Sequence, residues 1–140
     1  MHRVVTSAIV LALLGGCAAS PRLAPPAGRQ FDGVYRGNTT LLRGWGFPCG
    51  DPHLPHEITV RNGSFAYPFQ LDPPLEMPVA VRIAADGSFY RAEQYPMLER
   101  LFPSDPPTAW ITVRGRIVGS TLDATEKDLR CDRRSLLVRR

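Results

Sequence analysis

Apolar and polar residues alternate along most of the chain after residue 30, which is the two-residue period of β-strands. The clearest example surrounds Asn62-Gly63, a dipeptide typical of two-residue hairpin turns. The apolar side chains on both sides of this turn fall on one face of the hairpin, so turn chemistry and register agree. The turn predicts three cross-strand pairs, which are Arg61–Ser64, Val60–Phe65 and Ile58–Tyr67.

A second hairpin is predicted where Gly87 turns the chain. A two-residue loop would place Ile83 opposite Tyr90, whereas a three-residue loop over 85–87 places it opposite Phe89. The three-residue loop is preferred, because its last position needs a left-handed backbone that glycine adopts readily.

The same pattern predicts about eight short strands in one domain. Strands joined mostly by short hairpins form an antiparallel meander, and such a meander can close into a small barrel that removes exposed edges. We therefore expect an all-β domain that forms a closed or nearly closed barrel, with one short helical turn at 97–102. An open curved sheet or a sandwich is the alternative. The expected strands are 31–38, 56–61, 64–70, 78–84, 88–92, 108–118, 120–126 and 131–139.

The N-terminal segment has a different pattern. After Arg3, the mostly apolar run from Val4 to Leu14 is too short to span a bilayer, which needs roughly 20 residues. It is typical of the apolar region of a secretory signal peptide. The run ends in Leu14-Gly15-Gly16-Cys17, which resembles the lipobox of bacterial lipoproteins. The alternatives are an ordinary signal peptide with a chance cysteine, or a buried N-terminal helix.

The lipoprotein resemblance implies an organisation and a location. It implies a signal peptide over 1–16, a lipidated Cys17 with a proline-rich tether over 17–30, and a β domain over 31–140. More than one acyl chain on Cys17 would anchor the protein stably to a membrane of the cell envelope, facing the periplasm. Ala18, in place of an aspartate after the cysteine, favours the outer membrane over the inner membrane.

The two other cysteines fit an oxidising compartment. Cys49 and Cys131 form an even pair, and we expect a disulfide between them, the alternative being two unpaired thiols. Cys49 also begins a stretch that contains His53 and His56, which are possible metal ligands. Their Cys-x3-His-x2-His spacing is not that of a zinc finger, so we expect no metal and no other cofactor.

Motifs and charge favour a binding domain over an enzyme. The sequence has no G-x-S-x-G, H-E-x-x-H or P-loop motif. Residues 114–140 contain eight basic and four acidic residues, so the whole net charge of +4 is concentrated there. Basic residues on neighbouring strands predict a cationic patch for an anionic polymer or an envelope protein, the alternative being a solvated face of mixed charge. The candidate binding residues of this patch are Arg114, Arg116, Arg133 and Arg139.

Two aromatic residues are further candidates. Trp45 and Phe47 lie in a glycine-rich loop, where they would either cover one end of the barrel or contact a partner. Two functions therefore stay open: binding of a protein or envelope polymer, with no role for nucleic acid, or binding of a small molecule inside the barrel. The outline of the domain is similar to that of C-type lysozyme inhibitors, but their Ser-Gly loop is not found, and the domain is assigned to no family.

Overall fold

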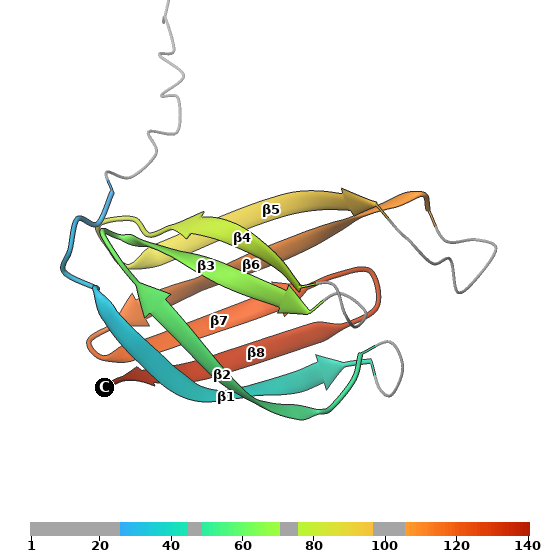
Figure 1. Cartoon of the computed structure of the whole chain (residues 1–140), viewed down its shortest axis with the longest axis horizontal. Helices are drawn as coiled ribbons and strands as arrows, with labels where there is room; N and C mark the ends of the chain where they lie inside the picture. The colour runs from blue at the N-terminus through green and yellow to red at the C-terminus, as the bar shows by residue number, and fades with distance from the viewer. Residues whose placement is uncertain (1–25, 45–48, 71–75, 97–105) are drawn as a thin grey trace, which may run out of the picture.

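The computed structural model describes residues 26–44, 49–70, 76–96 and 106–140, and their regular structure is entirely β (Figure 1). Antiparallel strands form a six-stranded sheet in the order β2-β1-β8-β7-β6-β5 and a two-stranded sheet of β3 and β4. The strands are β1 (Gly33–Arg43), β2 (His53–Val60), β3 (Ser64–Gln70), β4 (Glu76–Arg82), β5 (Ser88–Pro96), β6 (Thr108–Val118), β7 (Thr121–Lys127) and β8 (Asp132–Arg139).

The structure confirms part of the predicted fold. The all-β class and the eight antiparallel strands are confirmed. The closed barrel is wrong, because neither sheet of the described residues closes on itself. The described part of the chain contains no helix, and the helical turn expected at 97–102 lies outside it.

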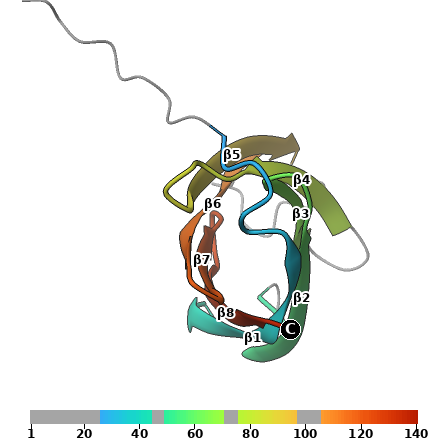
Figure 2. The same ribbon diagram turned by 90° about the vertical axis from the view of Figure 1, so that its left-hand side faces the viewer.

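Two turns join the small sheet to the large one. Each turn carries one isolated bridge, Arg61–Ser64 after β2 and Ile83–Phe89 before β5. The β3–β4 sheet extends from these turns over the inner side of the large sheet (Figures 1 and 2). β2 and β3 diverge beyond their turn, so the predicted pairs further along this hairpin, Val60–Phe65 and Ile58–Tyr67, do not form.

Missing backbone donors limit how far this hairpin can extend. Arg61 and Ser64 exchange both N–H···O bonds across the turn, and in an antiparallel hairpin every second pair does the same. Continuing that register would bring Pro68 and Pro55 to such hydrogen-bonded positions. Proline has no N–H to donate. β2 pairs instead with β1 along its other edge, and β3 pairs with β4.

The second turn confirms the three-residue loop. The N–H of Gly87 donates to the carbonyl of Ala84 over 2.9 Å, and Ile83 pairs with Phe89. Gly87 has a φ of 84°, the left-handed conformation on which the prediction depended. Residues from the end of the expected tether pack against this turn, since the N–H of Ala27 donates to the carbonyl of Ile83 over 3.0 Å.

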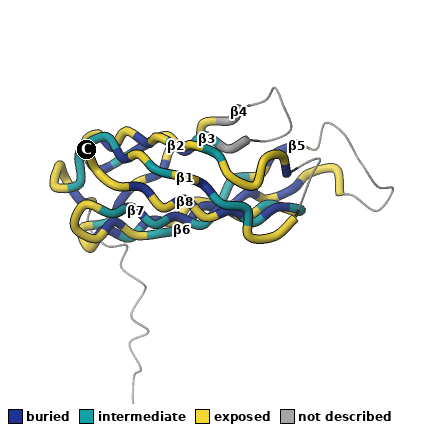
Figure 3. Tube along the Cα trace, turned by 90° about the horizontal axis from the view of Figure 1, so that it is seen from below, coloured by how far each residue is buried: buried dark blue, intermediate teal, exposed yellow. Residues whose placement is uncertain are grey.

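The core lies between the two sheets. Buried and exposed positions alternate along the strands, as Figure 3 shows. Phe65 and Phe89 connect the sheets, with their rings edge to face and their centroids 5.2 Å apart. Gly115 leaves room for this contact, because a Cβ there would lie 2.6 Å from the ring of Phe89. The largest fully buried side chains are Tyr35, Tyr67, Ile58, Ile83, Ile111, Ile117, Leu122, Leu137, Val60, Val81 and Val113.

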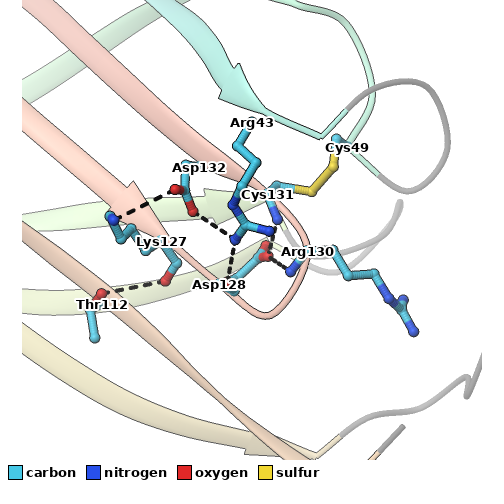
Figure 4. A network of polar contacts seen from close by, with 8 residues as sticks. All are labelled: Arg43, Cys49, Thr112, Lys127, Asp128, Arg130, Cys131 and Asp132. Atoms are coloured by element: carbon cyan, nitrogen blue, oxygen red, sulfur yellow. Dashed lines mark hydrogen bonds and ion pairs between the residues drawn. A yellow bond between two sulfur atoms is a disulfide. The ribbon is translucent and has the colours of Figure 1, made fainter. Parts of the chain in front are cut away.

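The opposite end of the domain is held by a disulfide and a capped turn (Figure 4). Cys49 is bonded to Cys131, which confirms the predicted disulfide. In the turn between β7 and β8, the Asp128 carboxylate accepts hydrogen bonds from the backbone N–H groups of Arg130 and Cys131, each over 2.6 Å. The disulfide therefore ties the chain before β2 to a turn that already has a fixed backbone.

Ion pairs extend this network to β1. Arg43 donates to the Asp132 carboxylate over 2.9 Å, and Lys127 lies 3.6 Å from its other oxygen. The hydrogen bond from Arg43 is the main reason why the pKa of Asp132 lies below its usual value.

Replacing both Cys49 and Cys131 by alanine should lower the free energy of unfolding by as much as about 4 kcal/mol, because the bond restricts the unfolded chain. The two residues are 82 positions apart, a separation for which chain entropy favours a large effect. Urea denaturation of the oxidised protein and the double variant measures the difference. The reduced wild-type protein should match the variant, and equal midpoints for oxidised and reduced protein would contradict the prediction.

Candidate functional site

Polar side chains occupy one part of the otherwise apolar interior. Strand alternation places them there, since Glu126 follows Leu122 and Ala124 on the inner face of β7, and Arg133 precedes Ser135 on the inner face of β8. Five strands contribute to the group, which we call the polar cluster. Its members are Thr39, His56, Tyr67, Glu126, Arg133 and Ser135.

Hydrogen bonds connect four strands within the polar cluster. The Thr39 hydroxyl lies 2.6 Å from the Ser135 hydroxyl and 2.8 Å from Nδ1 of His56. The same Nδ1 lies 2.9 Å from Ser135, and the Tyr67 hydroxyl lies 3.3 Å from Ser135. Burial lowers the pKa of His56, which favours a neutral imidazole. Its Nε2 is buried without a hydrogen-bond partner among the described residues.

Glu126 and Arg133 place opposite charges in the interior. They are directly opposite each other in the β7–β8 register, and their exposed fractions are 4% and 6%. Burial raises the pKa of Glu126 to about 7, and the charge of Asp128 adds to this, while Arg133 and a hydrogen bond with Tyr67 oppose it. Arg133 also donates to the carbonyl of Asp51 over 3.3 Å.

A small cavity adjoins the polar cluster. Its volume is about 40 Å³, and Leu54, Pro55 and Pro68 from the diverging parts of β2 and β3 complete its lining. One water molecule needs roughly 10–15 Å³, so the cavity has room for about three. Ligand pockets of roughly 300 Å³ or more are far larger, so the arrangement fits buried water or the tip of one polar group.

Three of the four arginines predicted to form a cationic patch are exposed. Arg114 and Arg116 are exposed on the outer face of β6, as its alternation predicts, and Arg139 is exposed near the end of β8. Arg133 does not join them, because Arg133, Ser135 and Leu137 form the inner face of β8. Arg133 therefore belongs to the polar cluster and not to the predicted cationic patch.

Carboxylates neutralise much of the remaining outer face. Arg116 pairs with Asp86 over 2.8 Å, and Arg134 donates twice to Asp123, over 2.9 and 2.6 Å. The Arg134 hydrogen bonds are the main cause of a lowered pKa at Asp123. Arg114 makes no ion pair with any described residue.

Two exposed aromatic side chains share this outer face with Arg114. Tyr90 is directly opposite Arg114 in the β5–β6 register and is 66% exposed, and Trp110 on β6 is 59% exposed. The alternation of β6 placed Trp110 and Arg114 on one face, but only the register of β5 could add Tyr90. We call Tyr90, Trp110 and Arg114 the aromatic face.

The possible metal ligands do not come together. Cys49 is in the disulfide, and His53 is exposed whereas His56 faces the interior, as residues three apart on a strand must. Nowhere in the described ranges do three His, Cys, Asp or Glu side chains form a group that could hold a metal ion.

Several sequence candidates fall on residues that the structure does not describe. Trp45, Phe47 and Cys17 all lie outside the described ranges. No helix in the described ranges is long and apolar enough to cross a membrane. No family model, curated protein sequence or solved structure matches this chain.

Replacing Glu126 by glutamine should make stability less dependent on pH. The pKa of Glu126 is raised in the folded protein, so its stabilising contribution is complete below pH 4.5 and is lost as the pH rises through 7. The variant should match the wild type near pH 4.5 and exceed it at pH 8.5 by up to about 3 kcal/mol. Urea denaturation across this pH range measures the difference.

The matched control is Glu57→Gln, because Glu57 is an exposed carboxylate paired with Arg36 on the surface. It should shift stability by less than about 1 kcal/mol at any pH. A stability difference between Glu126→Gln and wild type that stays constant with pH would contradict the proposed titration of Glu126.

Proposed function

We propose that this protein is a lipid-anchored component of the bacterial cell envelope whose non-catalytic β domain binds a protein or an envelope polymer at its surface. The motif Leu14-Gly15-Gly16-Cys17 supports the anchor, and it favours the outer membrane with the domain facing the periplasm. The observation that carries the binding role is the aromatic face, where two large aromatic rings and an arginine outside any described ion pair share one exposed sheet surface.

The residue types of the aromatic face are those that contribute most to binding. Trp, Tyr and Arg are enriched among the interface residues whose truncation costs the most affinity. Leu136 and Val138, which are 52% and 48% exposed on the outer face of β8, lie on the same sheet but are separated from β6 by β7. The neighbouring ion pairs supply a polar rim, which is the usual anatomy of a binding surface.

The interior supports surface binding more than small-molecule binding. A small-molecule role would require a cavity of a few hundred Å³, whereas the polar cavity has about 40 Å³. Nε2 of His56, which has no hydrogen-bond partner among the described residues, favours a ligand there, but about three water molecules would satisfy it as well.

Replacing Cys17 by serine should prevent acylation and move the protein from the membrane fraction to the soluble fraction, or leave it unprocessed. The physical reason is that the remaining chain has only a short apolar leader to hold it at the bilayer. Detergent partitioning and intact-mass measurement of both proteins test this. A serine variant that is processed and partitions like wild type would show that Cys17 is not the anchor.

Changing the aromatic face together, by Tyr90→Ala, Trp110→Ala and Arg114→Gln, should weaken binding by at least about tenfold. Cosedimentation with purified peptidoglycan and with envelope protein fractions, in the Cys17→Ser background, measures the loss. The control variant is Asn38→Ala with Thr40→Ala on the outer face of β1. Equal retention of all three proteins at every salt concentration would remove the aromatic face from the proposal.

A further inference from the structure

A second surface feature lies beside the free edge of β2, where β2 and β3 diverge (Figure 1), and we call it the β2–β3 seam. An open hollow of about 380 Å³ lies along it, and the polar cavity also borders on both strands. Small or polar side chains line most of this hollow, and most of them are exposed. The lining residues are Thr59, Arg61, Ser64, Phe65, Ala66 and Ala80.

The free edge of β2 faces the seam. Arg61 directs both its N–H and its carbonyl toward Ser64, and strand alternation directs those of Thr59 and Glu57 to the same side. Val34, which is opposite Thr59 on β1, directs its carbonyl away toward Arg140 at the end of the chain. Thr59 and Glu57 therefore have backbone groups that no strand of the described residues pairs.

The free edge of β2 is unusual because β2 and β3 cannot pair continuously along it. Exposed strand edges are normally covered or blocked, since they recruit other strands. Here Pro55 and Pro68 prevent continuous pairing of β2 with β3, yet Thr59 and Glu57 keep their N–H groups. The side chains of Ala66 and Ala80 are small, so the hollow beside this edge is not filled from the β3–β4 side.

Unpaired positive charge lies beside the seam. Arg61 lines the hollow, and Arg82 is opposite Ser64 in the β3–β4 register. Both arginines are exposed and make no ion pair with a described residue. On the large sheet, in contrast, Arg116 and Arg134 each have a carboxylate partner. The seam is therefore complementary to negative charge.

We propose that the β2–β3 seam binds an extended, acidic peptide segment of a partner protein, which adds as a strand to the free edge of β2. The peptide main chain bonds to Thr59 and Glu57, as in other cases of strand addition. Its acidic side chains lie beside Arg61 and Arg82, which determine its charge preference. This site is separate from the aromatic face and does not depend on it.

The test uses a displayed library of random octapeptides, selected on the full-length lipidated protein in detergent micelles. We expect enriched peptides that combine acidic residues with strand-forming residues. The variant Thr59→Pro removes one edge N–H while proline remains compatible with an edge strand, and it should weaken binding of a selected peptide at least tenfold. Thr59→Val keeps that N–H and is the matched control, which should bind like wild type.

Two further measurements separate the parts of the proposal. Arg61→Gln with Arg82→Gln should weaken binding severalfold and reduce its dependence on salt. N-methylation of alternate peptide bonds in the selected peptide should abolish binding to the wild-type protein, and this result does not depend on the folding of any variant. Tyr90→Ala with Trp110→Ala should leave peptide binding unchanged.

Three outcomes would overturn the proposal. They are the failure of any peptide to enrich, the enrichment of basic peptides, and the binding of selected peptides that Thr59→Pro and N-methylation leave intact. Loss of peptide binding in the Tyr90→Ala, Trp110→Ala variant would assign the peptide to the aromatic face and would also reject the seam.

Discussion

The supply of backbone hydrogen-bond donors along β2 and β3 limits how far their hairpin can extend, and the division of this domain into two sheets goes with that limit. Pro55 and Pro68 would occupy hydrogen-bonded positions if the Asn62-Gly63 hairpin continued, and neither has a donor. The eight strands therefore divide into a sheet of six and a sheet of two, with the core between them. The polar cavity and the β2–β3 seam both lie at this division, so the same constraint produces the two openings of the domain.

Stability alone does not explain why the side chains of the polar cluster are buried. Burying two charges costs free energy that their mutual attraction offsets only in part, and apolar replacements of such pairs are often neutral or stabilising. Glu126 illustrates this, because desolvation outweighs Arg133 in setting its pKa. What the cluster does provide is directional contact, since Tyr67 from the small sheet meets Ser135 of the large sheet there. This contact joins the two sheets at a defined point, as the contact between the Phe65 and Phe89 rings does elsewhere.

Local chemistry predicted much of the fold. The bridges Arg61–Ser64 and Ile83–Phe89 follow from the turn types, and the disulfide follows from the even pair of cysteines left after Cys17. The cross-strand pairs predicted beyond the first turn do not form. A proline interrupts pairing only where the register places it at a hydrogen-bonded position, and the pattern of a single strand does not reveal that position.

The candidate site was harder to predict, because it depends on which face of a strand turns inward. In β8 the adjacent Leu136 and Leu137 give no preference between the two faces, so the pattern does not show that Arg133 points inward. Glu126 continues the inner alternation of β7, but a carboxylate is not expected in a core, so alternation alone does not predict its burial. Tyr90 needed the β5–β6 register, which no local signal supplies.

The contact between the N-terminal segment and the β4–β5 turn has a mechanical consequence. Tension on this segment would first load a few separate contacts, among them the hydrogen bonds from Ala27 to Ile83 and from Gln30 to Ala85, which can break one at a time. The next structured element, β1, is paired along both edges, with β2 and with β8. Pulling along β1 loads these two ladders in shear, so many hydrogen bonds must break together. The domain thus yields easily to force at its N-terminal segment and resists force from β1 onward.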